Sequence, residues 1–591
     1  MVNRAEPINL IDFTGGLNLR KNQFQLAENE SPEMINISID PLGGIYTRQG
    51  WHRWSENIVP EGDPWDPHRA YLIQFSDGVD MVYVAANNTV FWADPAGAFT
   101  DLGISAEAVP HMADFDAFGD DVYIACGREN QLVRRRRDLA PVLLTEAASG
   151  TWNDDYLNPA GGVGPKAELI EAHSGYLFAA NLTEDGVVMP NRLRWSHPTS
   201  PEDWAQADYI DIDIGGSKIT ALRSYEDHLL IFKNDSVWAL YGYDADSWQL
   251  VQKSATVGAP SPQAVSRNEQ VVFFYSPSDR GSVYAYGGER PMEIGTQLRR
   301  ALESLTRPDL VWVGWIGRRL WVTLPWTYEG PTDEDAGVFV FDPSVGNGAW
   351  TYYAAQSGSL GPIVAGSNVD SQIRPMGVLR SNEVPCVVQL TAIEQAADEI
   401  WEFTMLGYAA SPSVSAELGF IVTGDDAETG AEIILDGIPG VESFETVYRT
   451  GWITADWPTR KKSFRRPNFI CRYTGYDHNL QVRSYRDYEE VSARRQHTLT
   501  VPAGRIVSGP PGGTGQVAAV WNTFNWNDGT LWNQEGSPPV VTSPGKEGAS
   551  IRRGSSFGLC RALQMRIKGS TPKARWGIDA IILKVVMRRF R

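Results

Sequence analysis

His228-Leu-Leu-Ile-Phe232 and, after a short loop, Ser236-Val-Trp-Ala-Leu-Tyr241 form the stretch of sequence that decides the fold. Both runs are short, apolar and rich in β-branched or aromatic residues, which is typical of paired strands. The same pair of runs, opened by a polar residue, recurs along the chain. The openers lie near residues 80, 121, 174, 227, 270 and 318, so the spacing is about 41, 53, 53, 43 and 48 residues. This is the period of a four-stranded propeller blade.

The sequence therefore predicts an all-β protein in which residues 66–400 form a β-propeller of about six to seven blades. The unequal spacing fits loops of different length inserted on one face of the ring. A pair of β-sandwiches would also give regular short strands and is the alternative architecture. We expect one amphipathic helix of about two to three turns, Thr296-Gln-Leu-Arg-Arg-Ala-Leu-Glu-Ser-Leu305.

The two ends of the chain differ from this central repeat. Residues 1–65 predict an extended N-terminal arm without a core of its own, which must pack on the rest of the chain or on a neighbour. Its double glycine, Gly15-Gly16, lets the backbone turn through positive φ.

Residues 401–591 predict a C-terminal β-sandwich-like platform domain. Apolar and polar residues alternate in Leu480-Gln-Val-Arg-Ser-Tyr485 and in Leu563-Gln-Met-Arg-Ile-Lys568, which indicates one buried face and one wet, basic face. A Gly/Pro/Trp-rich insertion near 505–550 is expected to be a long loop within this domain.

Charge is unevenly distributed over the 591 residues, whose formal net charge of −20 argues against simple attraction to nucleic acid. Between Glu56 and Asp121 there are thirteen acidic residues and one cation, Arg69. From Arg552 to the end there are eleven cations and one acid, Asp579. Either these are two solvated surfaces, or acidic and basic faces meet in neighbouring subunits.

Other sequence features point to a cytoplasmic origin. The four cysteines, at 126, 386, 471 and 560, form no CxxC motif and indicate neither a disulfide framework nor a zinc site. The N-terminus has no apolar signal region, and no apolar run approaches the roughly 18 residues of a spanning helix. We expect synthesis in the cytoplasm and no membrane insertion by the protein itself.

The motifs of common catalytic sites are missing from the sequence. There is no phosphate-binding loop, no nucleophile elbow and no HExxH, and Gly161-Gly-Val-Gly-Pro-Lys166 is interpreted as a turn. His173, His197 and His228 lie at predicted strand ends and are not expected to be catalytic. We predict that the protein is not an enzyme, needs no cofactor or metal, and has no catalytic, cofactor-binding or metal-binding residues.

Two acidic clusters and two basic runs have open interpretations. Asp211-Ile-Asp-Ile-Gly-Gly216 and Asp333-Glu-Asp-Ala-Gly337 lack the bidentate glutamate of a calcium loop, so solvated turn acids are favoured. Arg134-Arg-Arg-Arg-Asp138 and Arg460-Lys-Lys-Ser-Phe-Arg-Arg466 could contact phosphate, contact another subunit, or be solvated faces.

Segments spread along the chain resemble one known group of proteins. Phe13-Thr-Gly-Gly-Leu-Asn18, followed by Asn36-Ile-Ser-Ile-Asp-Pro-Leu-Gly-Gly-Ile-Tyr-Thr-Arg-Gln-Gly-Trp51, resembles the N-terminus of many phage tail proteins. The stretch from Glu171 to Trp204, with its Arg-Trp-Ser and Pro-Glu-Asp-Trp, is similar to one of their blades. Thr450-Gly-Trp-Ile453, the basic run at 460–466 and the closing strand at 576–587 resemble their second domain. In this order, the segments resemble the tail nozzle or hub (tail tubular) proteins of short-tailed bacteriophages.

The resemblance implies a structural virion protein located in the tail and made in the host cytoplasm. Six copies would form a ring on the tail axis, with a central channel through which viral DNA passes without sequence-specific contact during genome retention and ejection. Portal-adaptor and tail-fibre or tail-spike proteins would be its neighbours. No catalytic residues are carried over, and the chain is shorter than the larger nozzle proteins. An acidic channel wall would repel DNA and keep its passage fast.

Two alternative functions are kept. The first is a propeller that binds or hydrolyses glycans, with Trp521, Trp526 and Trp532 stacking on sugar rings. The second is a peripheral tail adhesin or fibre-attachment protein, which would more often be trimeric.

Overall fold

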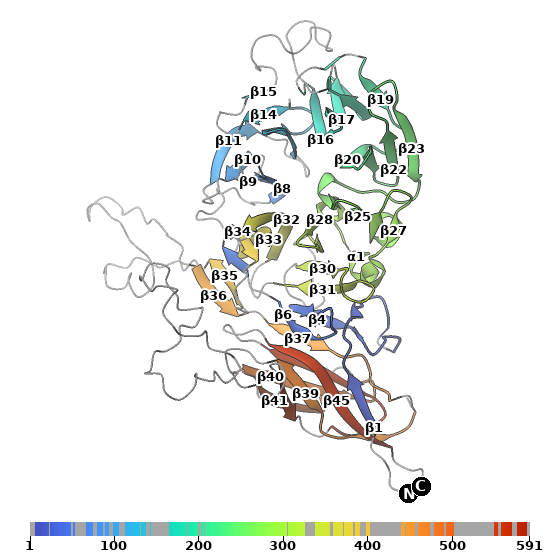
Figure 1. Ribbon diagram of the computed structural model, residues 1–591, viewed down its shortest axis with the longest axis vertical. Coiled ribbons are helices and arrows are strands. Elements are labelled where there is room, and N and C mark those ends of the chain that lie inside the picture. Colours follow the sequence, from blue (N-terminus) through green and yellow to red (C-terminus); the bar gives the residue numbers. More distant parts are fainter. Residues whose placement is uncertain are drawn as a thin grey trace, which may run out of the picture.

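The fold is all-β, with a propeller that stands on a sandwich (Figure 1). The computed structural model describes residues 6–143, 165–325, 337–401, 439–501 and 549–587, with shorter gaps inside these ranges, the longest at 54–66. The predicted insertion near 505–550, with its three tryptophans, and the acidic cluster at 333–335 lie almost wholly outside the described residues, as does the segment 161–164.

Five four-stranded antiparallel sheets follow one another from residue 67 to residue 293. In the first two, the strands are β8 (Pro67–Gln74), β9 (Asp80–Ala86), β10 (Thr89–Ala93) and β11 (Phe99–Ser105), then β12 (Asp114–Phe118), β13 (Asp121–Ala125), β14 (Val133–Arg136) and β15 (Val142–Leu143). The third contains β16 (Lys166–His173), β17 (Tyr176–Glu184), β18 (Val187–Trp195) and β19 (Tyr209–Asp211). The fourth and fifth contain β20 (Ile219–Tyr225), β21 (His228–Lys233), β22 (Val237–Tyr241), β23 (Gln249–Ser254), β24 (Val265–Arg267), β25 (Val272–Ser276), β26 (Ser282–Tyr286) and β27 (Met292–Glu293).

Two further four-stranded units complete the ring. The sixth consists of β28 (Trp312–Ile316), β29 (Arg319–Thr323), β30 (Val338–Asp342) and β31 (Ala349–Tyr353). The seventh consists of β32 (Ser359–Val369), β33 (Gln372–Ser381), β34 (Val384–Leu390) and, from the N-terminal arm, β7 (Trp51–Arg53), which pairs antiparallel with β34. The first strands of consecutive units contact one another, and β32 contacts β8, so the sheets close into a circle. The predicted propeller is confirmed, and the alternative of two sandwiches for residues 66–400 is wrong.

Helix is shorter than the sequence predicts. The expected helix at 296–305 is a 3-10 turn, Thr296–Leu298, followed by a single α-helical turn, α1 (Arg299–Leu302). The backbone N–H groups of Leu19 and Arg20 donate to the carbonyl of Gln297, which a longer helix would need for its own ladder. The arm is therefore bonded to this short helix through its backbone. The other short helices are 3-10 turns at Pro262–Ala264, Ser278–Arg280 and Pro308–Leu310.

The C-terminal sandwich contains two large sheets. One has the strand order β42 (Ala549–Arg553), β39 (Asn468–Arg472), β45 (Gly577–Met587), β38 (Lys462–Phe464) and β43 (Gly558–Cys560). The other contains β37 (Thr446–Arg449), β44 (Leu563–Gly569), β40 (His478–Arg486) and β41 (Arg495–Val501). Leu480, Val482, Leu563, Met565 and Ile567 are buried, whereas Gln481 and Arg483 are not, as the alternation predicts. Tyr485 and Gln564 were expected on the wet face and are buried, because the Gln564 amide donates to the Thr450 carbonyl and Tyr485 packs with Trp452. A two-stranded sheet, β35 (Ala397–Trp401) with β36 (Pro439–Ser443), lies between the propeller and sandwich strands in sequence.

The N-terminal arm joins these parts together. β1 (Glu6–Leu10) and β6 (Ile45–Thr47) pair with β45, and β5 (Ile37–Ile39) pairs with β6. β4 (Glu33–Ile35) lies between β31 of the sixth blade and β37 of the sandwich, so that one nine-stranded sheet runs from β28 to β41. β2 (Gly16–Leu17) and β3 (Glu30–Ser31) form a short parallel pair. The described part of the arm therefore packs on strands of its own chain.

Candidate functional site

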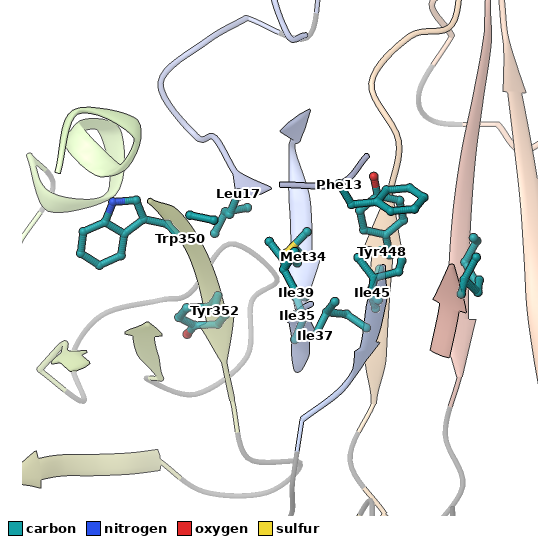
Figure 2. Packing of buried hydrophobic residues seen from close by; sticks show 14 of the residues in the cluster. Phe13, Leu17, Met34, Ile35, Ile37, Ile39, Ile45, Trp350, Tyr352 and Tyr448 are labelled. Atoms are coloured by element: carbon teal, nitrogen blue, oxygen red, sulfur yellow. The ribbon is translucent and has the colours of Figure 1, made fainter. Parts of the chain in front are cut away.

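Buried side chains of the arm fill the junction between propeller and sandwich. Figure 2 shows Leu17, Met34 and the isoleucines of β4–β6 between Trp350 and Tyr352 of the sixth blade and Tyr448 of the sandwich. The ring of Phe13 meets that of Tyr448 edge-on, with centroids 5.4 Å apart. Such burial and ring contacts hold the two parts in a fixed relation.

Asn36 is the centre of the hydrogen-bond network at this junction. Its side-chain Oδ1 accepts from the Arg48 Nε at 2.7 Å and from the Ala354 backbone N–H at 2.8 Å. Its Nδ2 donates to the Glu445 carbonyl at 2.8 Å, and its own N–H donates to the Tyr352 carbonyl. Asn36 has φ of +55°, a conformation that asparagine tolerates better than most residues. One buried amide thus connects arm, propeller and sandwich.

The segments that carry the family resemblance meet here. Gly16 has φ of +64°, as expected for the double glycine, and a Cβ there would lie 2.8 Å from the Trp350 carbonyl oxygen. The Arg48 guanidinium is buried and also donates to the Ala354 carbonyl. Gly451 lies against the backbone of Ala27, and Ile453 forms a bridge with Leu563. Of the quoted segments, the stretch 171–204 lies elsewhere, in the third blade.

A second polar network surrounds the propeller axis. On β12, Asp116 accepts from the Ala172 N–H of β16 at 2.5 Å, and on β16, Glu171 accepts from the Ser224 N–H of β20 at 2.7 Å. Arg223 of β20 donates to Glu171 and to the Pro262 carbonyl beside β24. Each side chain therefore bonds the innermost strand of another blade. Asp116, Glu171 and Arg223 all stand two residues before the end of a first strand, a recurrence that is present in the sequence but that a search for catalytic motifs does not detect.

Burial shifts the pKa values of titratable groups in and beside this polar network. Burial of the Asp116 carboxyl and the nearby Glu171 charge raise its pKa to about 7, although backbone N–H bonds and Arg223 oppose the shift. Burial also lowers the pKa of His173 to about 4, with the nearby His228 adding to the effect. The two residues act in opposite senses on the pH dependence of stability.

We expect the pH profile of unfolding to separate these two groups. Between pH 4 and 7 the folded state binds more protons at Asp116 than the unfolded state does, so this group makes stability fall as pH rises. Between pH 4 and 6.5 the folded state binds fewer protons at His173, so that group makes stability rise with pH. The slope of melting temperature against pH, relative to that of the wild type, should therefore be more positive in Asp116→Asn and less positive in His173→Asn. Parallel profiles for both variants would contradict the assignment.

Two of the three histidines at predicted strand ends are close together. His173 Nδ1 lies 2.7 Å from Ser224 Oγ, and His228 Nδ1 lies 2.8 Å from Asp227. His228 Nε2 also lies 3.2 Å from the Tyr286 hydroxyl. His197 lies apart on the surface and contacts its neighbouring Pro198 carbonyl. No carboxylate bonds His173 in the described part of the chain, so the Ser224–His173 pair lacks the orienting acid of a catalytic triad.

The cluster at 211–216 is partly neutralised by cations of the same chain. Arg192 binds the Asp211 carboxylate with two nitrogens, at 2.8 and 2.9 Å, and also contacts Glu184. The buried Lys233 ammonium donates to the Ile212 and Asp213 carbonyls. Asp211 is therefore an ion-pair partner rather than the solvated turn acid that we expected. Within the described ranges no group of three or more His, Cys, Asp or Glu side chains could hold a metal ion.

The two basic runs differ in their surroundings. Arg134 pairs with Asp121 at 2.8 Å, and the buried Arg135 guanidinium lies 4.2 Å from the centre of the Trp92 ring. These two side chains are engaged within the blade. In the second run, Lys462 is buried and donates to the Arg561 carbonyl, but Lys461, Arg465 and Arg466 are exposed.

The three described cysteines, at 126, 471 and 560, are buried free thiols. Burial raises the pKa of each thiol to about 12, so they remain protonated and act as small apolar residues. Among the described residues, no helix has the length and apolar character that spanning a membrane requires.

The fold thus defines the class: a β-propeller joined to a β-sandwich. No family model and no curated protein matches the chain. Solved structures with a similar fold include a streptogramin B lyase, with 11% identity over 58% of this chain and 97% of that chain and a TM-score of 0.36. Virginiamycin B lyase from Staphylococcus aureus is 12% identical over 57% of this chain and 98% of that chain, with a TM-score of 0.36. The Pan2 WD40 domain of Neurospora crassa is 10% identical over 59% of this chain and 96% of that chain, with a TM-score of 0.35. At such values these likenesses carry no argument about function.

Proposed function

We propose that this protein is a structural ring component of a short-tailed phage tail, a nozzle or hub protein with a channel for DNA. The observation that carries the proposal is the nine-stranded sheet, which continues from the sixth blade through β4 of the arm into the sandwich. A ring subunit needs its parts in a fixed relation, because small errors in orientation accumulate around a closed ring. The segments that resemble the nozzle family supply this junction.

The charge distribution is compatible with the same role. The chain as a whole is acidic, with a net charge of −20, and an acidic channel wall would not retain DNA through phosphate contacts. The basic strands of the sandwich would then face protein neighbours, with portal-adaptor and fibre or spike proteins as the expected classes.

Copy number in purified phage particles tests the proposal. Quantitative mass spectrometry, calibrated against capsid and portal proteins, should give about six copies of this chain per particle, the number that the family resemblance implies. Imaging of the same particles should then place it on the tail axis. Absence from the particles would overturn the structural role, and about three copies at the tail periphery would favour an adhesin.

A further inference from the structure

The two sheets of the sandwich carry cationic rows that differ in how they are neutralised. On the nine-stranded sheet, Arg449, Arg566 and Arg483 stand opposite one another on β37, β44 and β40. Two guanidinium nitrogens of Arg566 donate to the Glu33 carboxylate of the arm, which also lies 3.8 Å from Arg449. This row thus receives its acid from within the chain.

The second row lies on the other large sheet, which contains β39, β45 and β38. It receives no such acid from the described residues. The Arg465 N–H donates to the Lys584 carbonyl at 2.9 Å, which continues the antiparallel register of β38 with β45 and sets these two cations opposite each other. Both side chains are exposed, as are the nearby Lys461, Arg466 and Arg553. Like charges directly opposite each other destabilise a strand pair unless an anion lies between them. We call these five residues the cationic face.

None of the five forms an ion pair with an acid in the described part of the chain. In the described residues of 445–501 and 549–587 there are seventeen Lys and Arg and only four Asp and Glu. Because the whole chain carries −20, the remainder is strongly acidic. The molecule therefore has one basic end, and the complementary charge is on the same polypeptide but not at this face.

The face also carries apolar surface. Val586 of β45, Ser463 of β38 and Leu559 of β43 lie in one row by register, and Leu559 is 38% exposed. Ile582 and Val586 are partly exposed on the same side of β45 as Lys584. Exposed apolar side chains interspersed with cationic ones are compatible with a protein–protein contact.

A matching acidic surface exists on the propeller. In an antiparallel blade, the turns after the first and third strands lie at the same end. In the fourth and fifth blades these turns carry one exposed cation, Arg290, and six exposed acids: Glu226, Asp227, Asp244, Asp246, Glu269 and Glu289. Tyr243, 78% exposed, lies among them, and large exposed aromatic residues are preferred interface anchors. We call this the acidic turn face.

We propose that the cationic face of one copy docks on the acidic turn face of the next copy, head to tail. A head-to-tail contact closes into a ring when the rotation that relates neighbouring copies divides a full turn. The inference rests on the proposed ring function and names its subunit interface. Another copy of this chain is favoured over DNA as the occupant, because the cationic face includes exposed apolar surface at Leu559, which a protein surface can cover and a phosphate backbone cannot. The acidic turn face of a second copy also supplies the complementary charge.

Charge reversal on the full-length protein tests the interface. Sedimentation velocity of the wild type should show self-association at 50 mM NaCl that weakens at 500 mM. Arg465→Glu with Lys584→Glu should weaken this association by more than about tenfold. Arg20→Glu with Arg300→Glu is the matched control, because both arginines are exposed, lie outside the two faces and give the same change in net charge. Unchanged melting temperatures establish that all variants are folded.

A mixing experiment identifies the partner surface. Asp246→Lys with Glu269→Lys should also lose self-association, and mixing it with the Arg465→Glu/Lys584→Glu protein should restore binding between the two. Unchanged association in either variant, failure of the mixture to bind, or a monomeric wild type at 50 mM NaCl would overturn the interface. Tight binding of a labelled DNA duplex that requires Arg465 and Lys584, with association unaffected, would overturn it in favour of nucleic acid. If particles contained about six copies but charge reversal left self-association unchanged, the proposed ring function would stand and only this interface would be rejected.

Discussion

Replacing Asn36 with alanine is expected to lower the free energy of unfolding by about 3–5 kcal/mol, because three buried partners lose their hydrogen bonds together. The Arg48 Nε and the Ala354 N–H lose their acceptor, and the Glu445 carbonyl loses its donor. These partners belong to the arm, the propeller and the sandwich respectively. Scanning calorimetry should therefore show a lower melting temperature and also a separation of the unfolding transition into two.

Asn36→Gly separates the two contributions at this position. Glycine adopts φ of +55° without strain, whereas alanine there costs about 1–2 kcal/mol. Glycine should thus be the milder change by roughly that amount, and the remaining loss measures the hydrogen bonds. If glycine restored wild-type stability, only backbone conformation would matter and the network would contribute nothing. If neither variant changed the calorimetric trace, the junction would not be the element that couples the two parts.

The sequence is sufficient to locate the middle strands of six blades. The runs opened near 80, 121, 174, 227, 270 and 318 are β9, β13, β17, β21, β25 and β29, the second strand of each unit. These strands have neighbours on both sides, and β13, β17, β21, β25 and β29 are buried on both faces, so their sequences are nearly continuous apolar runs. The seventh blade is harder to recognise because Pro375 and Gly377 interrupt the apolar run of β33.

Long-range pairing could not be predicted from one sequence. The closing strand β7 is only three residues long and pairs with β34, more than 300 residues later. The acid that neutralises Arg566 is Glu33, 533 residues away, and no local pattern connects them. The polar network around the propeller axis differs, because the recurring position of Asp116 and Glu171 within their blades is visible in the sequence. Periodicity thus predicts which residues are buried, whereas the partners of buried charges follow from topology.

Replacing Glu33 is expected to cause the second large loss of folding stability. Its carboxylate is the only described acid that binds the row of Arg449, Arg566 and Arg483, and its side chain is 16% exposed. Glu33→Ala should destabilise the protein by about 2–3 kcal/mol, less than for a fully buried pair, because the partners retain some solvent. Glu33→Gln keeps an acceptor for Arg566 and should be intermediate. Glu303→Ala removes an exposed partner 3.9 Å from Arg280 and should change stability by less than about 0.5 kcal/mol.

Salt dependence distinguishes charge imbalance from lost packing in Glu33→Ala. Without the carboxylate, three guanidinium groups face one another across adjacent strands, and added NaCl screens their repulsion. Urea unfolding at 50 and 500 mM NaCl should therefore show that Glu33→Ala regains part of its lost stability at high salt, whereas Glu303→Ala does not. A loss that is equal at both salt concentrations would mean that Glu33 acts through packing of the arm. In that case the contrast between this neutralised row and the cationic face, on which the proposed subunit interface depends, would lose its basis.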